Sequence, residues 1–193
     1  MKILRGFAVA DEKAFLEGVA QIAARAPFRH LVTPGGHRMS VAMTNCGPLG
    51  WVSDRTGYRY DANDPGSGRR WPPMPEGFVR LAQEAAAQAG FAGFVPDACL
   101  INRYEPGAKL SLHQDEGDPA APIVSVSFGV AAVFLLGGLK RSDKPERILL
   151  EHGDVVVLGG EARMRFHGVL PLKRQFHPLT GEQRINLTFR KAG

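Results

Sequence analysis

The chain of 193 residues lacks most features that would mark a secreted, membrane-spanning or zinc-binding protein. Its two cysteines, Cys46 and Cys99, are not spaced as CxxC, so they predict neither a zinc site nor a redox motif. No apolar run approaches the roughly 18 residues that a membrane span needs, and the N-terminus turns acidic too early for a secretory signal. We therefore expect one cytoplasmic domain over residues 1–193, with no membrane partner.

Acidic residues are the minority among the charged side chains. The chain has 24 Lys and Arg against 19 Asp and Glu, a net charge of +5. A basic balance is compatible with a polyanionic partner, although many basic proteins never bind nucleic acid.

Apolar periodicity predicts two helices, over residues 11–26 and 75–89. Asp11 is the expected N-cap of the first helix, and Gly90 the expected stop of the second. The second half of the chain instead shows short strand patterns between Gly, Pro and Asp turns. These patterns are ACLINRY, LSLHQD, PIVSVSFGV, AVFLLGG, ERILLEHG, DVVVLGG, MRFHGV and RINLTFR. The order predicts an α+β fold, a sandwich or jelly roll with the helices covering one sheet.

Residues 33–77 are rich in Gly, Pro, Arg and aromatic side chains, and only SVAMTN and GYRYD are typical of strands there. A connection this long is usually functional or disordered. The aromatic residues Trp51, Tyr58, Tyr60 and Trp71 argue against disorder.

The segment LSLHQD carries the first candidate for chemistry. In a strand, His113 and Asp115 point to the same side and offer one imidazole and one carboxylate to a single point. His167, in MRFHGV, is the best third ligand, because it lies between apolar residues on an expected strand of the main sheet. Two His and one carboxylate leave iron(II) open positions for a co-substrate and dioxygen. HxD alone is common, and by itself it is more often a solvated strand end than part of a metal site.

The C-terminal segment RINLTFR alternates strictly between polar and apolar residues. Its polar face carries Arg184, Asn186, Thr188 and Arg190. Two interpretations stay open: an amphipathic surface strand with its arginines in water, or a clamp for a dicarboxylate such as 2-oxoglutarate, since arginine forms bidentate pairs with carboxylates.

With HxD, a later His and RxNxTxR in this order, the chain resembles the AlkB family of alkylation-repair dioxygenases. The resemblance covers nearly the whole chain and is carried by stretches such as TPGGHRMSVAMTNCGPLGW, PDACLINRYEPGAKLSLHQDE, LLEHGDVVVLGGEARMRFHGV and RINLTFR. It implies a double-stranded β-helix, or jelly-roll, core over residues 97–193, with helices packed on one side. Residues 33–77 would form an N-terminal nucleotide-recognition lid.

The resemblance also implies a role for individual residues. The iron(II) ligands would be His113, Asp115 and His167. The 2-oxoglutarate contacts would be Asn102, Tyr104, Arg184, Asn186 and Arg190, with Arg184 at the distal carboxylate. The substrate contacts would be Thr33, Met43, Trp51, Tyr58, Arg59, Tyr60, Asp118 and Arg141. From the residues alone, Asn102 and Tyr104 could instead mark a strand-to-turn transition, and Trp51 and Tyr58 could anchor a loop to the core.

The implied activity is oxidative demethylation of bases such as N1-methyladenine and N3-methylcytosine in DNA, with RNA as a further candidate. It would use Fe(II), 2-oxoglutarate and O2, and release formaldehyde, succinate and CO2. A 2-oxoglutarate oxygenase acting on tRNA, protein or another non-DNA substrate is the alternative, and a metal-binding jelly roll without activity is a third. A monomer is expected.

Two positions depart from the family's pattern. Gly117 stands where an acidic residue often helps to read the base edge, so Glu116 or Asp118 could take over that contact. Leu158 stands where a larger aromatic residue is expected. Both changes would affect substrate preference rather than the iron chemistry.

Overall fold

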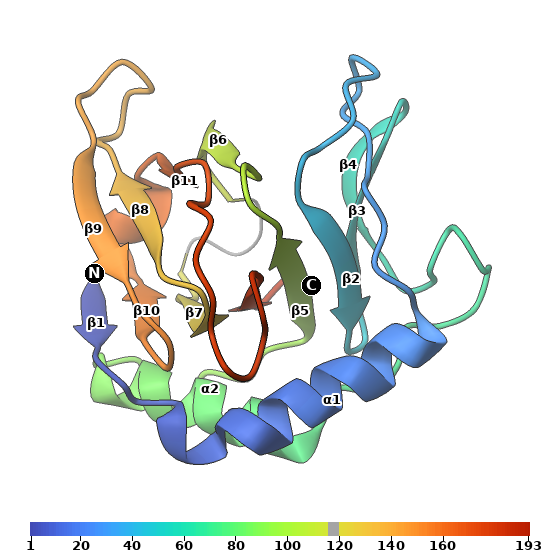
Figure 1. The fold of residues 1–193 in the computed structure, drawn as a ribbon, viewed down its shortest axis with the longest axis horizontal. Helices are drawn as coiled ribbons and strands as arrows, with labels where there is room; N and C mark the ends of the chain where they lie inside the picture. Colours follow the sequence, from blue (N-terminus) through green and yellow to red (C-terminus); the bar gives the residue numbers. More distant parts are fainter. Residues whose placement is uncertain (116–119) are drawn as a thin grey trace.

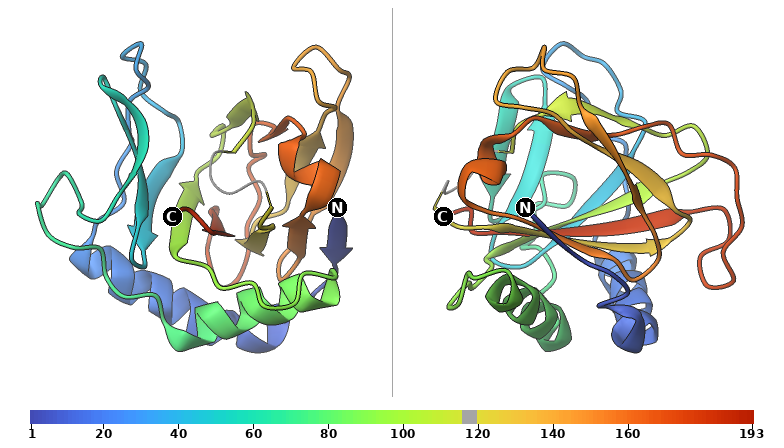
Figure 2. Two further views of the ribbon diagram at one scale, coloured as in Figure 1. Left: turned by 180° about the vertical axis from the view of Figure 1, so that it is seen from behind. Right: turned by 90° about the vertical axis from the view of Figure 1, so that its left-hand side faces the viewer.

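The computed structural model describes residues 1–115 and 120–193, which fold into two stacked sheets above a pair of helices (Figure 1). Seen edge-on in Figure 2, the helices, the larger sheet and the smaller sheet lie in successive layers. The larger sheet contains, in spatial order, β1 (Lys2–Leu4), β10 (Val155–Leu158), β7 (Ile123–Gly129), β12 (Arg184–Arg190), β5 (Ala98–Tyr104) and β2 (Ala42–Cys46). The smaller sheet contains β6 (Leu110–His113), β11 (His167–Val169), β8 (Ala132–Leu136) and β9 (Glu146–Leu150).

From β5 onward the chain passes repeatedly from one sheet to the other. Strands β5, β7, β10 and β12 lie in the larger sheet, whereas β6, β8, β9 and β11 lie in the smaller one, and their pairings are antiparallel. This crossing makes a double-stranded β-helix and confirms the predicted jelly roll.

Two helices cover the outer face of the larger sheet, as expected. They are α1 (Glu12–Arg25) and α2 (Glu76–Gln88). The rings of Phe15 and Phe78 stack at 4.3 Å between them, and Phe78 makes a T-shaped contact with Phe189 of β12. The helices therefore share one apolar core with the sheet beneath them. None of the described helices is both long and apolar enough to cross a membrane.

Of the two predicted helix-end residues, Gly90 acts as expected and Asp11 does not. Gly90 has a φ of +91° and follows α2, which fits its predicted role as the stop. Asp11, in contrast, does not cap α1 with its side chain. A short 3-10 helix, η1 (Val9–Asp11), precedes α1, and the Asp11 carboxylate instead accepts a hydrogen bond from Arg80 of α2 at 3.2 Å.

One strand was not predicted, and the prediction for another needs correction. The segment GWVSD forms β3 (Gly50–Asp54), which pairs with β4 (Gly57–Asp61) as a separate two-stranded hairpin. The strand that carries His167 belongs to the smaller sheet, not to the main one, and begins only at His167. It begins late because Gly160, with a φ of +56°, turns the chain into the 3-10 helix η2 (Gly160–Met164) just before it.

Candidate metal centre and co-substrate pocket

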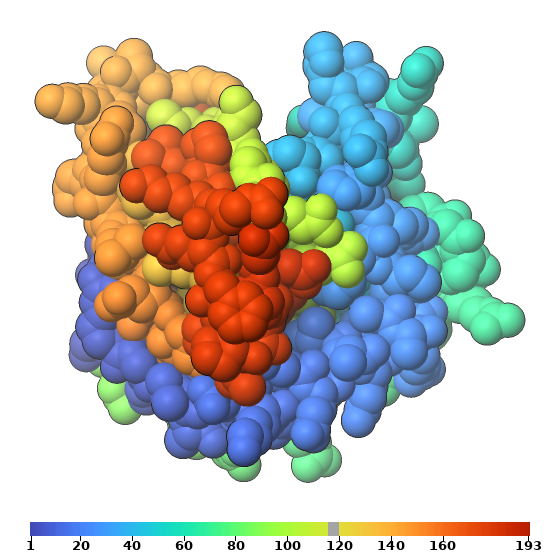
Figure 3. Space-filling model, in the orientation of Figure 1, coloured from blue at the N-terminus to red at the C-terminus, as the bar shows by residue number. Residues whose placement is uncertain are grey.

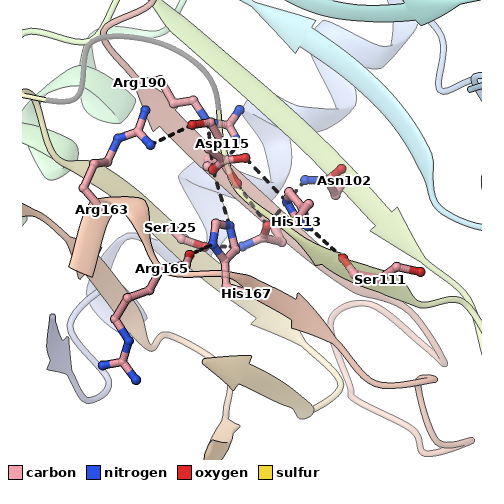
Figure 4. Close-up of polar contacts among 11 residues, drawn as sticks. Asn102, Ser111, His113, Asp115, Ser125, Arg163, Arg165, His167 and Arg190 are labelled. Atoms are coloured by element: carbon pink, nitrogen blue, oxygen red, sulfur yellow. Dashed lines mark hydrogen bonds and ion pairs between the residues drawn. The ribbon is translucent and has the colours of Figure 1, made fainter. Parts of the chain in front are cut away.

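The ends of two neighbouring strands bring three candidate metal ligands together (Figure 4). His113 ends β6 and is the antiparallel partner of His167, which begins β11. Asp115 lies two residues beyond β6, and its two carboxylate oxygens are each 3.5 Å from the Nε2 of one histidine. The ligand atoms of all three residues lie within 4.8 Å of one another. This spacing fits one metal ion held by two imidazoles and a carboxylate.

Backbone carbonyls fix the orientation of both imidazole rings. Nδ1 of His113 lies 2.8 Å from the Ser111 carbonyl, and Nδ1 of His167 lies 3.1 Å from the Arg165 carbonyl. A carbonyl oxygen can only accept, so each Nδ1 carries the hydrogen and donates it. The lone pair on each Nε2 is then free to bind a metal, as is usual for histidine ligands.

The Asp115 carboxylate is held anionic in a buried site. Burial by itself would raise the pKa of Asp115, but the Arg190 guanidinium is the largest influence that opposes it, and this pKa stays well below its usual range. Arg190 donates to Oδ2 from Nη2 at 2.8 Å and from Nε at 3.2 Å. In addition, Arg163 of η2 donates to the Asp115 carbonyl at 2.9 Å. No sequence motif predicts this contact of Arg163.

The polar face of β12 points into the space between the two sheets. Arg184, Asn186, Thr188 and Arg190 are only 2–7% exposed. The apolar face of the strand packs toward the helices instead. The surface-strand interpretation is therefore wrong, and two arginines are buried on one face where a dicarboxylate could reach them.

The Arg184 guanidinium is only partly satisfied. Its Nη2 donates to Ser127 Oγ at 3.0 Å, but its Nε and Nη1 are buried without a hydrogen-bond partner among the described residues. Its Cζ lies 5.0 Å from the centre of the Tyr104 ring. Burial lowers the pKa of Arg184, and the nearby Tyr104 hydroxyl opposes that shift. Buried donors without partners are rare in native proteins, and a carboxylate would satisfy these two.

Asparagine side chains continue the pocket from Arg184 along β12 and β5. Asn102 Nδ2 donates to Asn186 Oδ1 at 3.4 Å, while Asn102 Oδ1 is buried without a partner among the described residues. Asn186 Nδ2 donates to Ser125 Oγ at 2.8 Å. Ser125 and Ser127 were not predicted, although the alternation in IVSVS places both on one face of β7.

An aromatic face lies on the β3–β4 hairpin. The pairs Trp51–Tyr60 and Ser53–Tyr58 sit opposite each other across the hairpin, so these four side chains share one face. The rings of Trp51 and Tyr58 stack at 5.7 Å with 16° between their planes. Burial raises the pKa of Tyr60, and the Arg190 guanidinium, which donates to the Asp115 carboxylate, opposes that rise. Tyr60 therefore lies on the side of the hairpin that faces Arg190.

Comparisons with known proteins agree with this arrangement. The model of the 2OG-Fe(II) oxygenase superfamily matches residues 1–190. The alpha-ketoglutarate-dependent dioxygenase AlkB of Salmonella typhimurium is 59% identical over 192 residues, covering 98% of this chain and 89% of the relative. The protein of the same name from Escherichia coli is 58% identical over 193 residues, covering 99% and 89%. The chain belongs to the AlkB family of 2OG-Fe(II) oxygenases.

A solved structure supports the same assignment at lower identity. "The structure of OsALKBH1" superimposes with a TM-score of 0.82 at 28% identity, covering 98% of this chain and 95% of the other. As an AlkB-family dioxygenase, the chain uses Fe(II) and 2-oxoglutarate. The free Nε2 atoms beside Asp115 fit the iron, and the unused donors of Arg184 fit a carboxylate of 2-oxoglutarate.

The other predicted substrate residues of this AlkB-family chain lie in different environments. Met43 is buried in the core between the sheets, as the antiparallel partner of Asn102. The Thr33 hydroxyl accepts a hydrogen bond from the His37 N–H at 3.2 Å, within its own turn. Arg141 is exposed on the loop between β8 and β9. Figure 3 shows the surface notched between this loop and the segment that precedes β2.

Two further predicted residues are not brought to the aromatic face. Arg59 pairs with Val52 on the opposite face of the hairpin, where its guanidinium lies 2.9 Å from Asp54 and 3.8 Å from Asp61. Asp118 lies outside the described residues, as do Glu116 and Gly117, so the expected base-reading contact has no structural description.

Proposed function

We propose that this chain oxidatively removes alkyl groups from ring nitrogens of nucleic-acid bases, with DNA as its substrate. The observation that carries this proposal is the aromatic hairpin face beside the metal centre. Trp51 and Tyr58 stack in contact with solvent, while Tyr60, on the same face, reaches Arg190 beside Asp115. A base turned out of its helix needs a flat ring to stack on and a reactive centre within reach.

In this proposal the chain's residues bind and orient the reacting groups. Bound Fe(II), with 2-oxoglutarate and O2, supplies the oxidising power that hydroxylates the alkyl carbon and yields succinate, CO2 and, from a methyl group, formaldehyde. His113, Asp115 and His167 hold the metal. Arg184, with Tyr104 beside it and Asn102 and Asn186 along the pocket, binds the co-substrate and fixes its direction. The sheets exclude water from the pocket, which strengthens each of these contacts.

The hairpin and the β8–β9 loop bind the nucleic acid. A methylated base such as N1-methyladenine or N3-methylcytosine carries a positive charge, which favours an electron-rich aromatic face. Trp51 and Tyr58 would stack on it, while the exposed Arg141 contacts a phosphate from across the notch. We assign residues 33–77 to this lid and residues 97–193 to the catalytic core of a single domain, acting as a monomer.

The decisive experiment is aerobic incubation with Fe(II), 2-oxoglutarate, ascorbate and a DNA oligonucleotide that carries N1-methyladenine or N3-methylcytosine. We expect formaldehyde from the methylated strand and none from its unmethylated control. Silence on both strands would contradict the proposal. Release from methylated RNA but not from DNA would make RNA the substrate.

A variant separates nucleic-acid binding from iron chemistry. Arg141→Ala should weaken binding of the oligonucleotide and reduce its dependence on salt, because one phosphate contact is lost. Fe(II) binding should stay unchanged. Equal loss of iron binding would mean that Arg141 supports the fold rather than the substrate.

A further inference from the structure

The aromatic hairpin belongs to neither of the large sheets. Strands β3 and β4 pair with each other as a separate two-stranded sheet. Among the residues that the structure describes, three buried side chains attach the hairpin to its surroundings by hydrogen bonds that involve backbone atoms. The Ser53 hydroxyl donates to the Val32 carbonyl at 2.6 Å, and the Trp71 indole N–H donates to the Asp61 carbonyl at 2.9 Å. The third attachment is made by Asn45.

Asn45 binds both backbone groups of one residue. It lies on β2, is 2% exposed, and offers its amide to Trp51. Its Nδ2 donates to the Trp51 carbonyl at 3.0 Å, and its Oδ1 accepts from the Trp51 N–H at 3.0 Å. A carboxamide has the same donor and acceptor as a peptide group. Asn45 therefore takes the place of a neighbouring strand at the residue that carries the aromatic ring.

The Trp71 ring packs beside these two bonds. The buried Trp71 ring lies so close to Gly50 that a Cβ there would come within 2.4 Å of the indole. The same Cβ would come within 2.9 Å of the Asn45 Cβ. The absence of a side chain at Gly50 thus allows the indole and Asn45 to pack closely against the start of β3, next to the two hydrogen bonds.

We propose that Asn45 is a positioning residue that fixes the Trp51 ring for base recognition, and so sets the affinity for the alkylated strand. This inference rests on the function proposed above. Two hydrogen bonds to the two backbone groups of one residue resist both sliding and rotation of that residue. Without them, the hydrogen bonds of Ser53 and Trp71 and the packing of Val52 would still attach the hairpin, but the Trp51 backbone would lose both of its bonds to Asn45. The ring would then sample positions that do not match a bound base.

The test compares Asn45→Ala with Thr44→Val. Thr44 is the adjacent residue of β2 and is as buried as Asn45. Its hydroxyl also donates a hydrogen bond to a backbone carbonyl, that of Ala26 at 2.6 Å. Its partner ends a helix rather than the hairpin, so it controls for the loss of a buried hydrogen bond. We expect Asn45→Ala to raise the KM for a methylated oligonucleotide roughly ten-fold, the size of one to two lost hydrogen bonds. The KM for 2-oxoglutarate should stay unchanged, and Thr44→Val should leave both values unchanged.

Hydrogen exchange supplies a reading without substrate. In Asn45→Ala, faster exchange should be confined to residues 50–61, and β5 and β12 should keep the wild-type rates. A KM within two-fold of wild type would overturn the inference, as would faster exchange spread over β5 and β12.

Two further outcomes are also decisive. If Asn45→Ala does not fold, Asn45→Asp replaces it in the test. Aspartate keeps the size of the side chain and the acceptor for the Trp51 N–H, but it places an oxygen opposite the Trp51 carbonyl. A wild-type KM for the oligonucleotide in Asn45→Asp would overturn the inference. If wild-type protein releases no formaldehyde, the proposed function fails. The positioning role then stands or falls on the exchange of residues 50–61 alone.

Discussion

The metal centre and the aromatic hairpin are held by opposite means. Strand β12, which carries Arg184 and Arg190, is paired along its length with β5 on one side and β7 on the other. Among the described residues, strands β3 and β4 of the hairpin pair only with each other, and single side chains such as Asn45 attach the hairpin to the rest of the chain. Arg184 is 2% exposed, whereas Tyr58 is 46% exposed.

Because of this difference, we expect substitutions in the two regions to affect different properties of the protein. In the core, a buried charge such as Asp115 is coupled to its neighbours, so its removal harms the fold and the chemistry together. On the hairpin, the exposed Tyr58 ring and the partly buried Trp51 ring contribute less to folding than the buried charges do, so their removal should harm mainly the binding of substrate. Substitutions in each region test whether this separation holds.

The largest effect is expected from Asp115→Ala. The variant removes the acidic metal ligand and leaves the buried Arg190 guanidinium without its carboxylate. Turnover should fall to background, Fe(II) affinity should drop, and the melting temperature should decrease. Succinate release, metal titration and thermal unfolding measure these three results.

The control for Asp115 is Asp154→Asn. Asp154 is a buried carboxylate that accepts the Gly6 and Glu151 N–H groups at 2.9 Å and pairs with Arg5, away from the metal centre. Its loss should lower the melting temperature and leave iron affinity intact. Residual turnover of Asp115→Ala would show that the ligand assignment is wrong.

The next largest effect is expected from Arg184→Met, which keeps the length of the side chain but loses its charge. A charge-assisted bidentate pair contributes about 3 kcal/mol, which corresponds to a rise in the KM for 2-oxoglutarate of roughly 100-fold. Arg103→Met is the matched control, because Arg103 lies on β5 but stacks on Phe28. If both variants raised this KM equally, Arg184 would not bind the co-substrate.

The core could be predicted well because its signals are local. The motifs ACLINRY and RINLTFR coincide with β5 and β12, and strict alternation separated the buried arginines from the apolar residues that face the helices. The contact between Arg163 and the Asp115 carbonyl could not be predicted, because it depends on how the chain turns into η2. No periodic pattern encodes that turn.

A smaller and more selective effect is expected from Trp51→Ala. Stacking of one base on an aromatic ring contributes about 1–3 kcal/mol, so the KM for a methylated oligonucleotide should rise roughly ten-fold or more. Succinate release without oligonucleotide should stay at the wild-type rate, and so should the KM for 2-oxoglutarate. Trp51→Phe, which keeps a flat ring, should recover most of the affinity. Loss of substrate-free turnover in Trp51→Ala would end the separation between the two regions.

The hairpin was harder to predict because its register depends on a strand with weak signals. The segment GWVSD contains Gly, Ser and Asp, which disfavour a strand, so β3 had no prediction and its pairing with β4 was unknown. Adjacent residues in a strand point to opposite faces, so Arg59 and Tyr60 cannot both lie on the aromatic face. Without the register of β3 and β4, the sequence did not show which of the two residues shares a face with Trp51. The two hydrogen bonds from Asn45 to the Trp51 backbone could not be predicted either, because they depend on how β2 lies beside β3 in three dimensions.

The smallest effect is expected at the turn of the hairpin. The Thr56 hydroxyl and its backbone N–H, together with Arg59, lower the pKa of Asp54 from 3.8 to about 2. Because the pKa in the folded protein is depressed, the ionised carboxylate stabilises the hairpin above pH 3.8, and this stabilisation is lost as the pH falls through about 2. Its size is small because Asp54 is exposed to solvent. Carboxyl NMR titration should place the midpoint near 2 in wild type and closer to 3.8 in Thr56→Ala, with turnover at neutral pH unchanged. A wild-type midpoint at 3.8 would mean that the turn is open in solution, and that the hairpin is ordered only where Asn45, Ser53 and Trp71 attach it.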